Sequence, residues 1–175
     1  MSTITKKICL LGDFNVGKTS LVRRFIEDKF SDRYLSTVGV KVSRKSVEIR
    51  TELEISWLNF LVWDLEGNTK FKSITPSYLK GASGSIIVAD LSRSDTLKNL
   101  NQHLKLFFEI NPQGKAIIAL NKADLIPAEK LAKLVENYQS RNFSKILGIY
   151  ATSAKTGEFV NEMFQSLAVA MMAST

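Results

Sequence analysis

The stretch Gly12-Asp13-Phe14-Asn15-Val16-Gly17-Lys18-Thr19 fits the pattern G-x-x-x-x-G-K-[ST]. An apolar run of strand length precedes it and apolar residues at helical spacing follow it, so a strand, a glycine loop and a helix occur in the required order. The two glycines allow backbone N–H groups to turn inward, toward the positive end of the helix. The stretch therefore predicts a phosphate-binding loop, in which Lys18 reaches the β- and γ-phosphates and Thr19 offers its hydroxyl to Mg²⁺.

Length and composition favour one domain, which we predict to span residues 1–175. The chain is 45% hydrophobic, enough for a sizeable core. Its longest apolar runs are far shorter than the ~20 residues that cross a bilayer, and the N-terminus has no charged-then-apolar signal sequence. The single cysteine, Cys9, lies in the first apolar run, where a buried structural thiol is expected. These features predict a cytoplasmic protein in a reducing compartment.

The net charge of +7 allows three acidic partners: nucleic acid, a membrane face or a protein. The densest basic patch alternates with valine and isoleucine, and consists of Lys41, Arg44, Lys45 and Arg50. This alternation is typical of the solvated face of an amphipathic strand. Since no aromatic-basic motif accompanies it, we predict no specific nucleic-acid partner and at most a weak membrane contact.

Apolar patterns of strand and helix length alternate along the chain. Predicted strands cover residues 7–11, 40–50, 56–64, 85–90, 116–120 and 145–150. Predicted helices follow Thr19, lie near Pro76, start from a cap at Ser94 or Asp95, open at Pro127, and span 159–172. The link after residue 50 is too short for a parallel crossover, so the second and third strands should form a hairpin. The pattern predicts an α/β P-loop NTPase fold: a six-stranded, mostly parallel sheet with one antiparallel edge strand and helices on both faces.

Four polar motifs follow strands at the same edge of this predicted sheet, starting at Gly12, Asp64, Asn121 and Ser153. Because parallel sheets bind ligands at the carboxyl ends of their strands, we expect one shared site. The only histidine, His103, lies on a predicted helix without a second histidine or a cysteine partner. It is therefore predicted to be a helix-surface residue rather than a metal ligand or a catalytic group.

With these motifs, essentially the whole chain resembles the small GTPases, and within them the Rab-like branch. Asn121-Lys122-Ala123-Asp124 matches N-K-x-D, whose aspartate favours guanine over adenine, and Ser153-Ala154-Lys155 matches the S-A-K loop. Asp64–Gly67 matches the D-x-x-G of switch II, and residues 31–39 include the switch-I threonine at Thr37. The resemblance implies a GTP-hydrolysing molecular switch.

The resemblance also implies roles for individual residues. GTP or GDP is expected to be bound by Gly12, Asp13, Asn15, Val16, Gly17, Lys18, Thr19, Ser20, Phe30, Tyr34, Thr37, Gly67, Asn121, Lys122, Asp124, Ser153, Ala154 and Lys155. Mg²⁺ is expected on Thr19, Thr37 and Asp64, and turnover is expected to depend on Lys18, Thr37, Gly67 and Asn68.

The Rab-like features include Thr37-Val38-Gly39-Val40 and the tryptophan directly before Asp64. Val42, Trp63 and Tyr78 fall at the positions of an exposed triad that presents the nucleotide state to effectors in Rab proteins, with valine replacing the usual phenylalanine. The alternative is that the two aromatic residues belong to the core. Activating and exchange factors are further expected partners.

Three departures from the family pattern concern hydrolysis. Asn68 replaces the glutamine that orients the attacking water. Phe14 replaces a small residue, and its ring would fill the space that the water-orienting side chain or an incoming arginine finger needs. Leu65-Glu66 replaces Thr-Ala and brings a carboxylate near an anionic site. We therefore predict that nucleotide binding is retained better than turnover, with a low intrinsic hydrolysis rate.

Two other functions remain open on the sequence. One is a nucleotide-bound interaction module that never cycles, and the other is an ATP-using P-loop phosphotransferase or ATPase, against which Asn121–Asp124 argues. The given residues end without a cysteine for prenylation and begin without a myristoylation signal. We expect a protein that works in solution, contacts membranes weakly through basic residues, or forms one domain of a longer chain.

Overall fold

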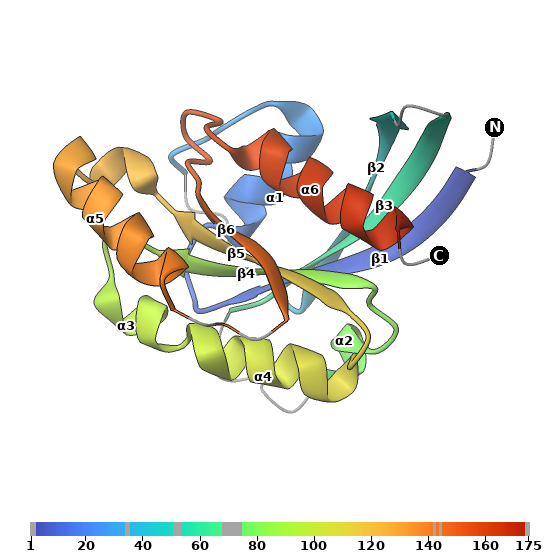
Figure 1. The fold of residues 1–175 in the computed structure, drawn as a ribbon, viewed down its shortest axis with the longest axis horizontal. Coiled ribbons are helices and arrows are strands. Elements are labelled where there is room, and N and C mark those ends of the chain that lie inside the picture. The colour runs from blue at the N-terminus through green and yellow to red at the C-terminus, as the bar shows by residue number, and fades with distance from the viewer. Residues whose placement is uncertain are drawn as a thin grey trace.

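The centre of the fold is a six-stranded sheet in the order β2-β3-β1-β4-β5-β6 (Figure 1). The computed structural model describes residues 3–33, 36–50, 54–67, 75–141, 143 and 145–173. The strands are β1 (Thr3–Gly12), β2 (Val40–Arg50), β3 (Ile55–Leu65), β4 (Gly84–Asp90), β5 (Lys115–Asn121) and β6 (Ile146–Ala151). All neighbouring pairs are parallel except β2 and β3, which form the antiparallel hairpin at one edge. The predicted sheet is confirmed.

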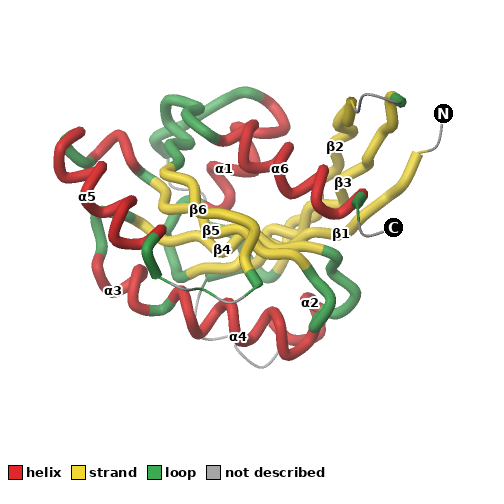
Figure 2. Tube along the Cα trace, in the orientation of Figure 1, coloured by secondary structure: helices red, strands yellow, loops and turns green. Residues whose placement is uncertain are grey.

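Helices cover both faces of the sheet (Figures 1 and 2). One face packs against α1 (Lys18–Glu27) and α6 (Val160–Met172). The opposite apolar cluster includes residues of α2 (Thr75–Leu79), α3 (Ser94–Lys98), α4 (Leu100–Ile110) and α5 (Ala128–Gln139). Among the described helices, none is long and apolar enough to cross a membrane.

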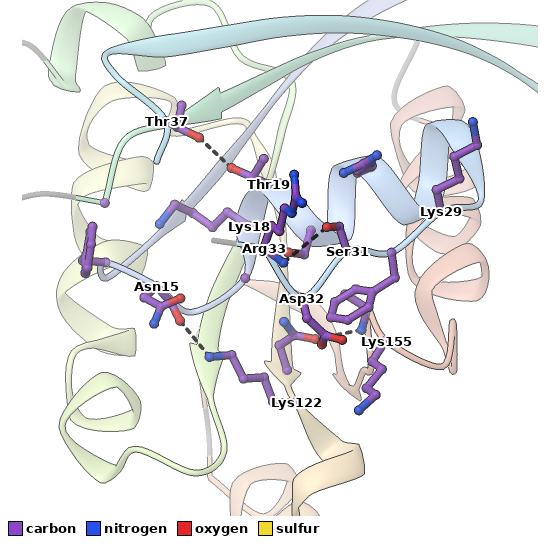
Figure 3. Close-up of a pocket in the computed structure, with 18 of the residues that line it drawn as sticks. Asn15, Lys18, Thr19, Lys29, Ser31, Asp32, Arg33, Thr37, Lys122 and Lys155 are labelled. Carbon is purple, nitrogen blue, oxygen red and sulfur yellow. Dashed lines mark hydrogen bonds between the residues drawn. The ribbon is translucent and has the colours of Figure 1, made fainter. Parts of the chain in front are cut away.

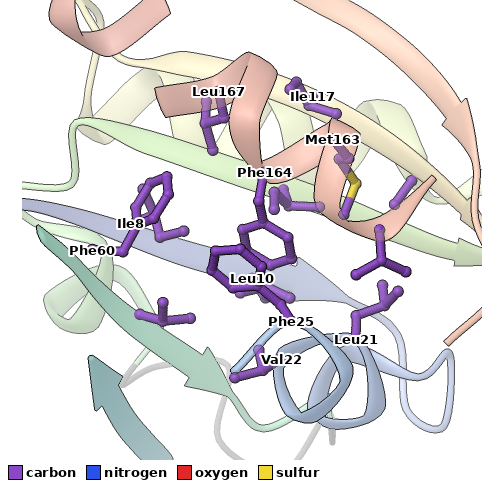
Figure 4. Packing of buried hydrophobic residues seen from close by; sticks show 14 of the residues in the cluster. Ile8, Leu10, Leu21, Val22, Phe25, Phe60, Ile117, Met163, Phe164 and Leu167 are labelled. Carbon is purple, nitrogen blue, oxygen red and sulfur yellow. The ribbon is translucent and has the colours of Figure 1, made fainter. Parts of the chain in front are cut away.

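Side chains of β1 point alternately to the two faces of the sheet and so contribute to both apolar clusters. Ile8 and Leu10 enter the cluster beneath α1 and α6, while Cys9 and Leu11 enter the other. Next to β1, the rings of Phe25 and Phe164 stack with centroids 3.8 Å apart (Figure 4). Burial of each large apolar side chain contributes roughly 1.5–3 kcal/mol. This packing fixes α1, and therefore the loop that precedes it, against the sheet.

Two predicted boundaries are wrong. β1 begins at Thr3 rather than at residue 7, because its register with β3 already starts at Thr3 and Trp57 and so includes a half-exposed segment. The helix predicted from residue 94 to 108 is divided at Asn99 into α3 and α4. Neither Ser94 nor Asp95 caps it, since Arg93 is the N-cap residue and makes no side-chain capping bond.

Candidate functional site

A cavity of about 420 Å³ opens at the carboxyl ends of the strands (Figure 3). It contains most of the side chains that the sequence predicts to bind nucleotide. Its described lining is Phe14, Asn15, Gly17, Lys18, Thr19, Ser20, Arg23, Lys29, Phe30, Ser31, Asp32, Arg33, Thr37, Leu65, Glu66, Gly67, Asn121, Lys122, Asp124, Leu125, Ala154 and Lys155. Of the remaining predicted residues, Gly12, Asp13, Val16, Asp64 and Ser153 do not line the cavity, and Tyr34 and Asn68 lie outside the described residues.

Glycine is required at both ends of the phosphate loop. At Gly12, a Cβ would lie 2.3 Å from the Val88 carbonyl oxygen of the neighbouring strand. Gly17 has φ +99°, and a Cβ there would lie 2.3 Å from Nδ2 of Asn121. Since α1 begins directly after Gly17, its unpaired N–H groups face the loop. The loop therefore has the geometry of an anion-binding helix N-terminus.

Lys18 is buried within the loop and donates through Nζ to the carbonyl oxygens of Gly12 and Asp13, each at 2.8 Å. Burial lowers the pKa of Lys18 to about 8, against the opposing charges of Asp64 and Asp13. Gly67 packs against the same ammonium, because a Cβ at that position would lie 2.6 Å from Lys18 Nζ. A larger residue at Gly67 would therefore displace this lysine.

Thr19, Thr37 and Asp64 meet at one end of the cavity, from α1, the loop before β2, and β3. The two threonine hydroxyls lie 2.6 Å apart, and Thr19 Oγ1 donates to Asp64 Oδ2 at 2.5 Å. Asp64 is 1% exposed, and among the described residues no group bonds to its Oδ1. Burial raises the pKa of this carboxyl, while hydrogen bonding from Thr19 and the charge of Lys18 oppose the rise. Two hydroxyl groups and one buried carboxylate fit the oxygen ligands that Mg²⁺ prefers.

Asn121 connects three segments at the other end of the cavity. Its Nδ2 donates to the Val16 carbonyl at 3.0 Å, and its Oδ1 accepts from Thr152 Oγ1 at 3.2 Å and from the Ala154 N–H at 3.3 Å. Asp124 accepts a 2.6 Å bond from the Ser153 hydroxyl. The N-K-x-D and S-A-K segments are therefore joined to each other and to the phosphate loop.

Lys122 crosses the cavity wall to the phosphate loop, where Nζ donates to the Asn15 carbonyl at 2.9 Å (Figure 3). The same ammonium lies 2.8 Å from Asp90 Oδ2. Although burial alone would raise the pKa of Asp90, the Lys122 ammonium and hydrogen bonds from Ser92 hold it below its ordinary value. Lys122 thus contacts a buried anion and the phosphate loop at once.

Asp13 makes side-chain contacts that the sequence did not predict. Its carboxylate turns to α4, where Asn99 Nδ2 donates to it at 2.7 Å and His103 Nε2 lies 2.8 Å away. Arg93 adds a 2.8 Å bond to the Phe14 carbonyl. His103 lies on a helix as predicted, but its side chain is only 20% exposed and contacts the phosphate loop, which the sequence did not indicate.

Sequence reasoning also missed several basic residues around the cavity. Arg23, Lys29 and Arg33 line it, and they lie in α1 and on the two sides of Phe30, where no motif singles them out. Arg24 does not line the cavity but binds the backbone of the 153–155 loop. Its Nε donates to the Ala154 carbonyl at 2.9 Å, and a terminal nitrogen donates to the Lys155 carbonyl at 2.6 Å.

The sheet, the glycine loop before α1, and the joined Asn121 and Asp124 segments define a P-loop nucleotide-binding domain. The family model described as "Ras of Complex, Roc, domain of DAPkinase" matches residues 7–124. Ras-related protein Rab-22A of Homo sapiens is 35% identical over 160 residues, covering 90% of this chain and 79% of the relative. Rab-13 of Mesocricetus auratus is 36% identical over 163 residues (93% and 77%), and Rab-31 of Rattus norvegicus is 33% identical over 164 residues (92% and 80%). The chain belongs to the Rab-like small GTPases of the Ras superfamily and is a GTP-binding switch protein.

Proposed function

We propose that this GTPase binds GTP and GDP with Mg²⁺, hydrolyses GTP slowly, and signals to effectors through the segments around Thr37 and Gly67. The observation that carries the proposal is the meeting of Thr19, Thr37 and Asp64 beside the phosphate loop. These groups come from three separate elements, one of which lies in the predicted switch I. A ligand at this point would therefore change the position of that loop.

At the phosphate end, the backbone N–H groups of the loop and Lys18 bind the phosphates. Mg²⁺, held by Thr19, Thr37 and Asp64, would supply charge neutralisation at the phosphate oxygens. Asp64 Oδ1, which has no partner among the described residues, supports this assignment, because an unpaired buried carboxylate oxygen is costly. The phosphate loop then orients the nucleotide, because its glycines let the backbone approach the phosphates closely.

At the other end, we assign base recognition to Asn121, Lys122 and Asp124, together with Phe30 and the 153–155 loop. Asp124 Oδ1 accepts from the Ser153 hydroxyl, which orients the carboxylate, and the acceptor sites left on the carboxylate are available to the base. A carboxylate at this place favours guanine, because it accepts from ring and exocyclic N–H groups that adenine does not present together. This selection argues against the ATP-using alternative.

Slow hydrolysis is proposed from two residues near the reacting end. Phe14 lines the cavity together with Gly67 and is 46% exposed. We propose that its ring restricts the region where a water-orienting group must act. Asn68, one methylene shorter than the family's glutamine, lies outside the described residues. Arginine fingers from activating proteins accelerate GTPases by ~10³–10⁵, and Phe14 would also obstruct such a group.

The test begins with titration of fluorescent GTP, GDP and ATP, with and without Mg²⁺. The proposal requires guanine nucleotides to bind in preference to ATP, and Mg²⁺ to slow their release. Single-turnover GTP hydrolysis is then compared between the wild type and the Asn68→Gln, Phe14→Gly double variant, with each single variant as a control. We expect the double variant to be about a hundredfold faster, the order of the rate that misplacement of a reacting group by about 1 Å costs. An unchanged rate would contradict the proposed cause of slow turnover.

A non-cycling, nucleotide-bound interaction module is the second candidate, and Phe14 in the cavity favours it. Nucleotide content after purification, together with release and hydrolysis rates, separates the two. Retained nucleotide with neither measurable release nor hydrolysis would support the module.

We also propose Val42, Trp63 and Tyr78 as part of the effector surface. The two aromatic rings lie with centroids 6.2 Å apart and are half-buried, while Val42 is exposed on the neighbouring strand. Lys7 Nζ lies 3.8 Å over the Trp63 ring and adds a positive charge beside the group. Nucleotide-dependent capture of an effector should be lost in a Val42→Asp variant if this surface is used.

A further inference from the structure

The hydrogen-bond ladder between β2 and β3 ends, between the two predicted switch segments, with a bond to a side chain instead of a backbone carbonyl. The antiparallel register of β2 and β3 reaches Val40 and Leu65, and the Glu66 N–H continues it by donating to the Gly39 carbonyl at 2.9 Å. Gly39 has φ +70°, outside the β region, and its N–H donates to the Glu66 side chain, at 2.8 Å from Oε2. A carboxylate therefore makes the bond that a backbone carbonyl makes elsewhere in the ladder.

This pair of bonds lies very close to the proposed Mg²⁺ and phosphate groups. Gly39 is two residues after Thr37, and Glu66 is two residues after Asp64. Val38, between the threonine and the glycine, is 79% exposed, so packing does little to position this segment. Within the described part of the chain, Thr37 is held by hydrogen bonds at its own hydroxyl and by the anchoring of Gly39.

We propose that Glu66 is a positioning residue, which holds Thr37 at the phosphate end of the cavity by anchoring Gly39 to the end of β3. The inference rests on the proposed function, in which Thr37 acts at the nucleotide site. It differs from the expectation that Glu66 merely adds a negative charge there. Removal of an unfavourable charge would slow nucleotide release, whereas loss of the anchor would speed it.

The sign of the effect can be measured with two substitutions. Glu66→Ala removes both the charge and the acceptor for the Gly39 N–H, whereas Glu66→Gln removes the charge and keeps an acceptor oxygen. Fluorescent GDP is first titrated into the wild type with Mg²⁺. Absence of binding at this step would defeat the proposed function itself, and with it this inference. Release of the bound nucleotide is then followed after addition of excess unlabelled GDP.

We expect GDP release to be about fivefold faster in Glu66→Ala, the order of one lost hydrogen bond in a partly exposed place. Release from Glu66→Gln should stay within about twofold of the wild type. In a Thr37→Ala background the Glu66→Ala substitution should no longer accelerate release, because the group it positions is gone. A role in overall stability alone would leave the acceleration unchanged in that background.

Several outcomes would overturn the inference: unchanged or slower release in Glu66→Ala, equal changes in the alanine and glutamine variants, or acceleration that persists without the Thr37 hydroxyl. Thermal unfolding of each variant shows whether it is folded. Glu66→Ser, which likewise cannot reach the Gly39 N–H, replaces the alanine variant if that protein does not fold.

Discussion

Truncation of Asn121 should destabilise the protein as well as its nucleotide site. The amide is almost fully buried and makes three hydrogen bonds, to Val16, Thr152 and Ala154. Asn121→Ala removes all three and leaves their partners unsatisfied. At about 1 kcal/mol for each bond, we expect a loss of about 3 kcal/mol in the free energy of unfolding. For a chain of this size that loss lowers Tm by about 6–12 °C.

The measurement is urea denaturation, monitored by the fluorescence of Trp57 and Trp63. The protein is used without nucleotide, because a bound ligand would add stability of its own. Asn101→Ala is the matched control, because this asparagine is exposed on α4 and alanine has the higher helix propensity. A loss below about 1 kcal/mol in Asn121→Ala, or one no larger than in the control, would show that the three bonds are not the source of stability inferred here.

Three further predictions concern single positions. Gly17→Ala should weaken binding of fluorescent GDP at least about tenfold, because the alanine would have a strained left-handed backbone and its Cβ would collide with Asn121. The control is Gly81→Ala: Gly81 has φ +77°, but no described atom lies within 4 Å of a Cβ there, so this variant should bind GDP as the wild type does. Asp124→Asn should shift the preference from guanine to xanthine nucleotides, and unchanged guanine selectivity would refute its assigned role. Cys9 should resist alkylation at pH 8 until urea unfolds the protein, because burial raises the pKa of its thiol to about 12; rapid labelling of the native protein would contradict this. Since the folded thiol keeps its proton longer than the unfolded one, its contribution to stability is complete below about pH 9 and is lost as the pH rises toward 12.

Much of the fold could be predicted because it is encoded over short distances in the chain. The apolar runs that became β4 and β5 identify buried parallel strands, and the short link after β2 allows only a hairpin. The spacing of Gly12 and Gly17 likewise predicts the phosphate loop without any tertiary information. These patterns depend on local backbone conformation and on the order of apolar and polar residues, and residues close together in the chain specify both.

The less predictable features depend on residues far apart in sequence. Asp13 has the pattern of a loop residue facing phosphate, yet its carboxylate bonds to Asn99 and His103, which α4 brings alongside. The division between α3 and α4 at Asn99 was missed because the apolar spacing continues through it. Only the docking of that helix on the sheet brings its histidine against the phosphate loop.

Residue types and their spacing identify the class of site: a glycine loop, an acid at the end of β3 and an N-K-x-D segment, all at strand ends that share one edge of a parallel sheet. The way these parts are joined, through Asn121 to Val16 and through Glu66 to Gly39, is visible only in the folded protein. A hydrogen bond between distant segments depends on the angle and distance at which their elements pack. Residue type shows only that a donor or an acceptor is present.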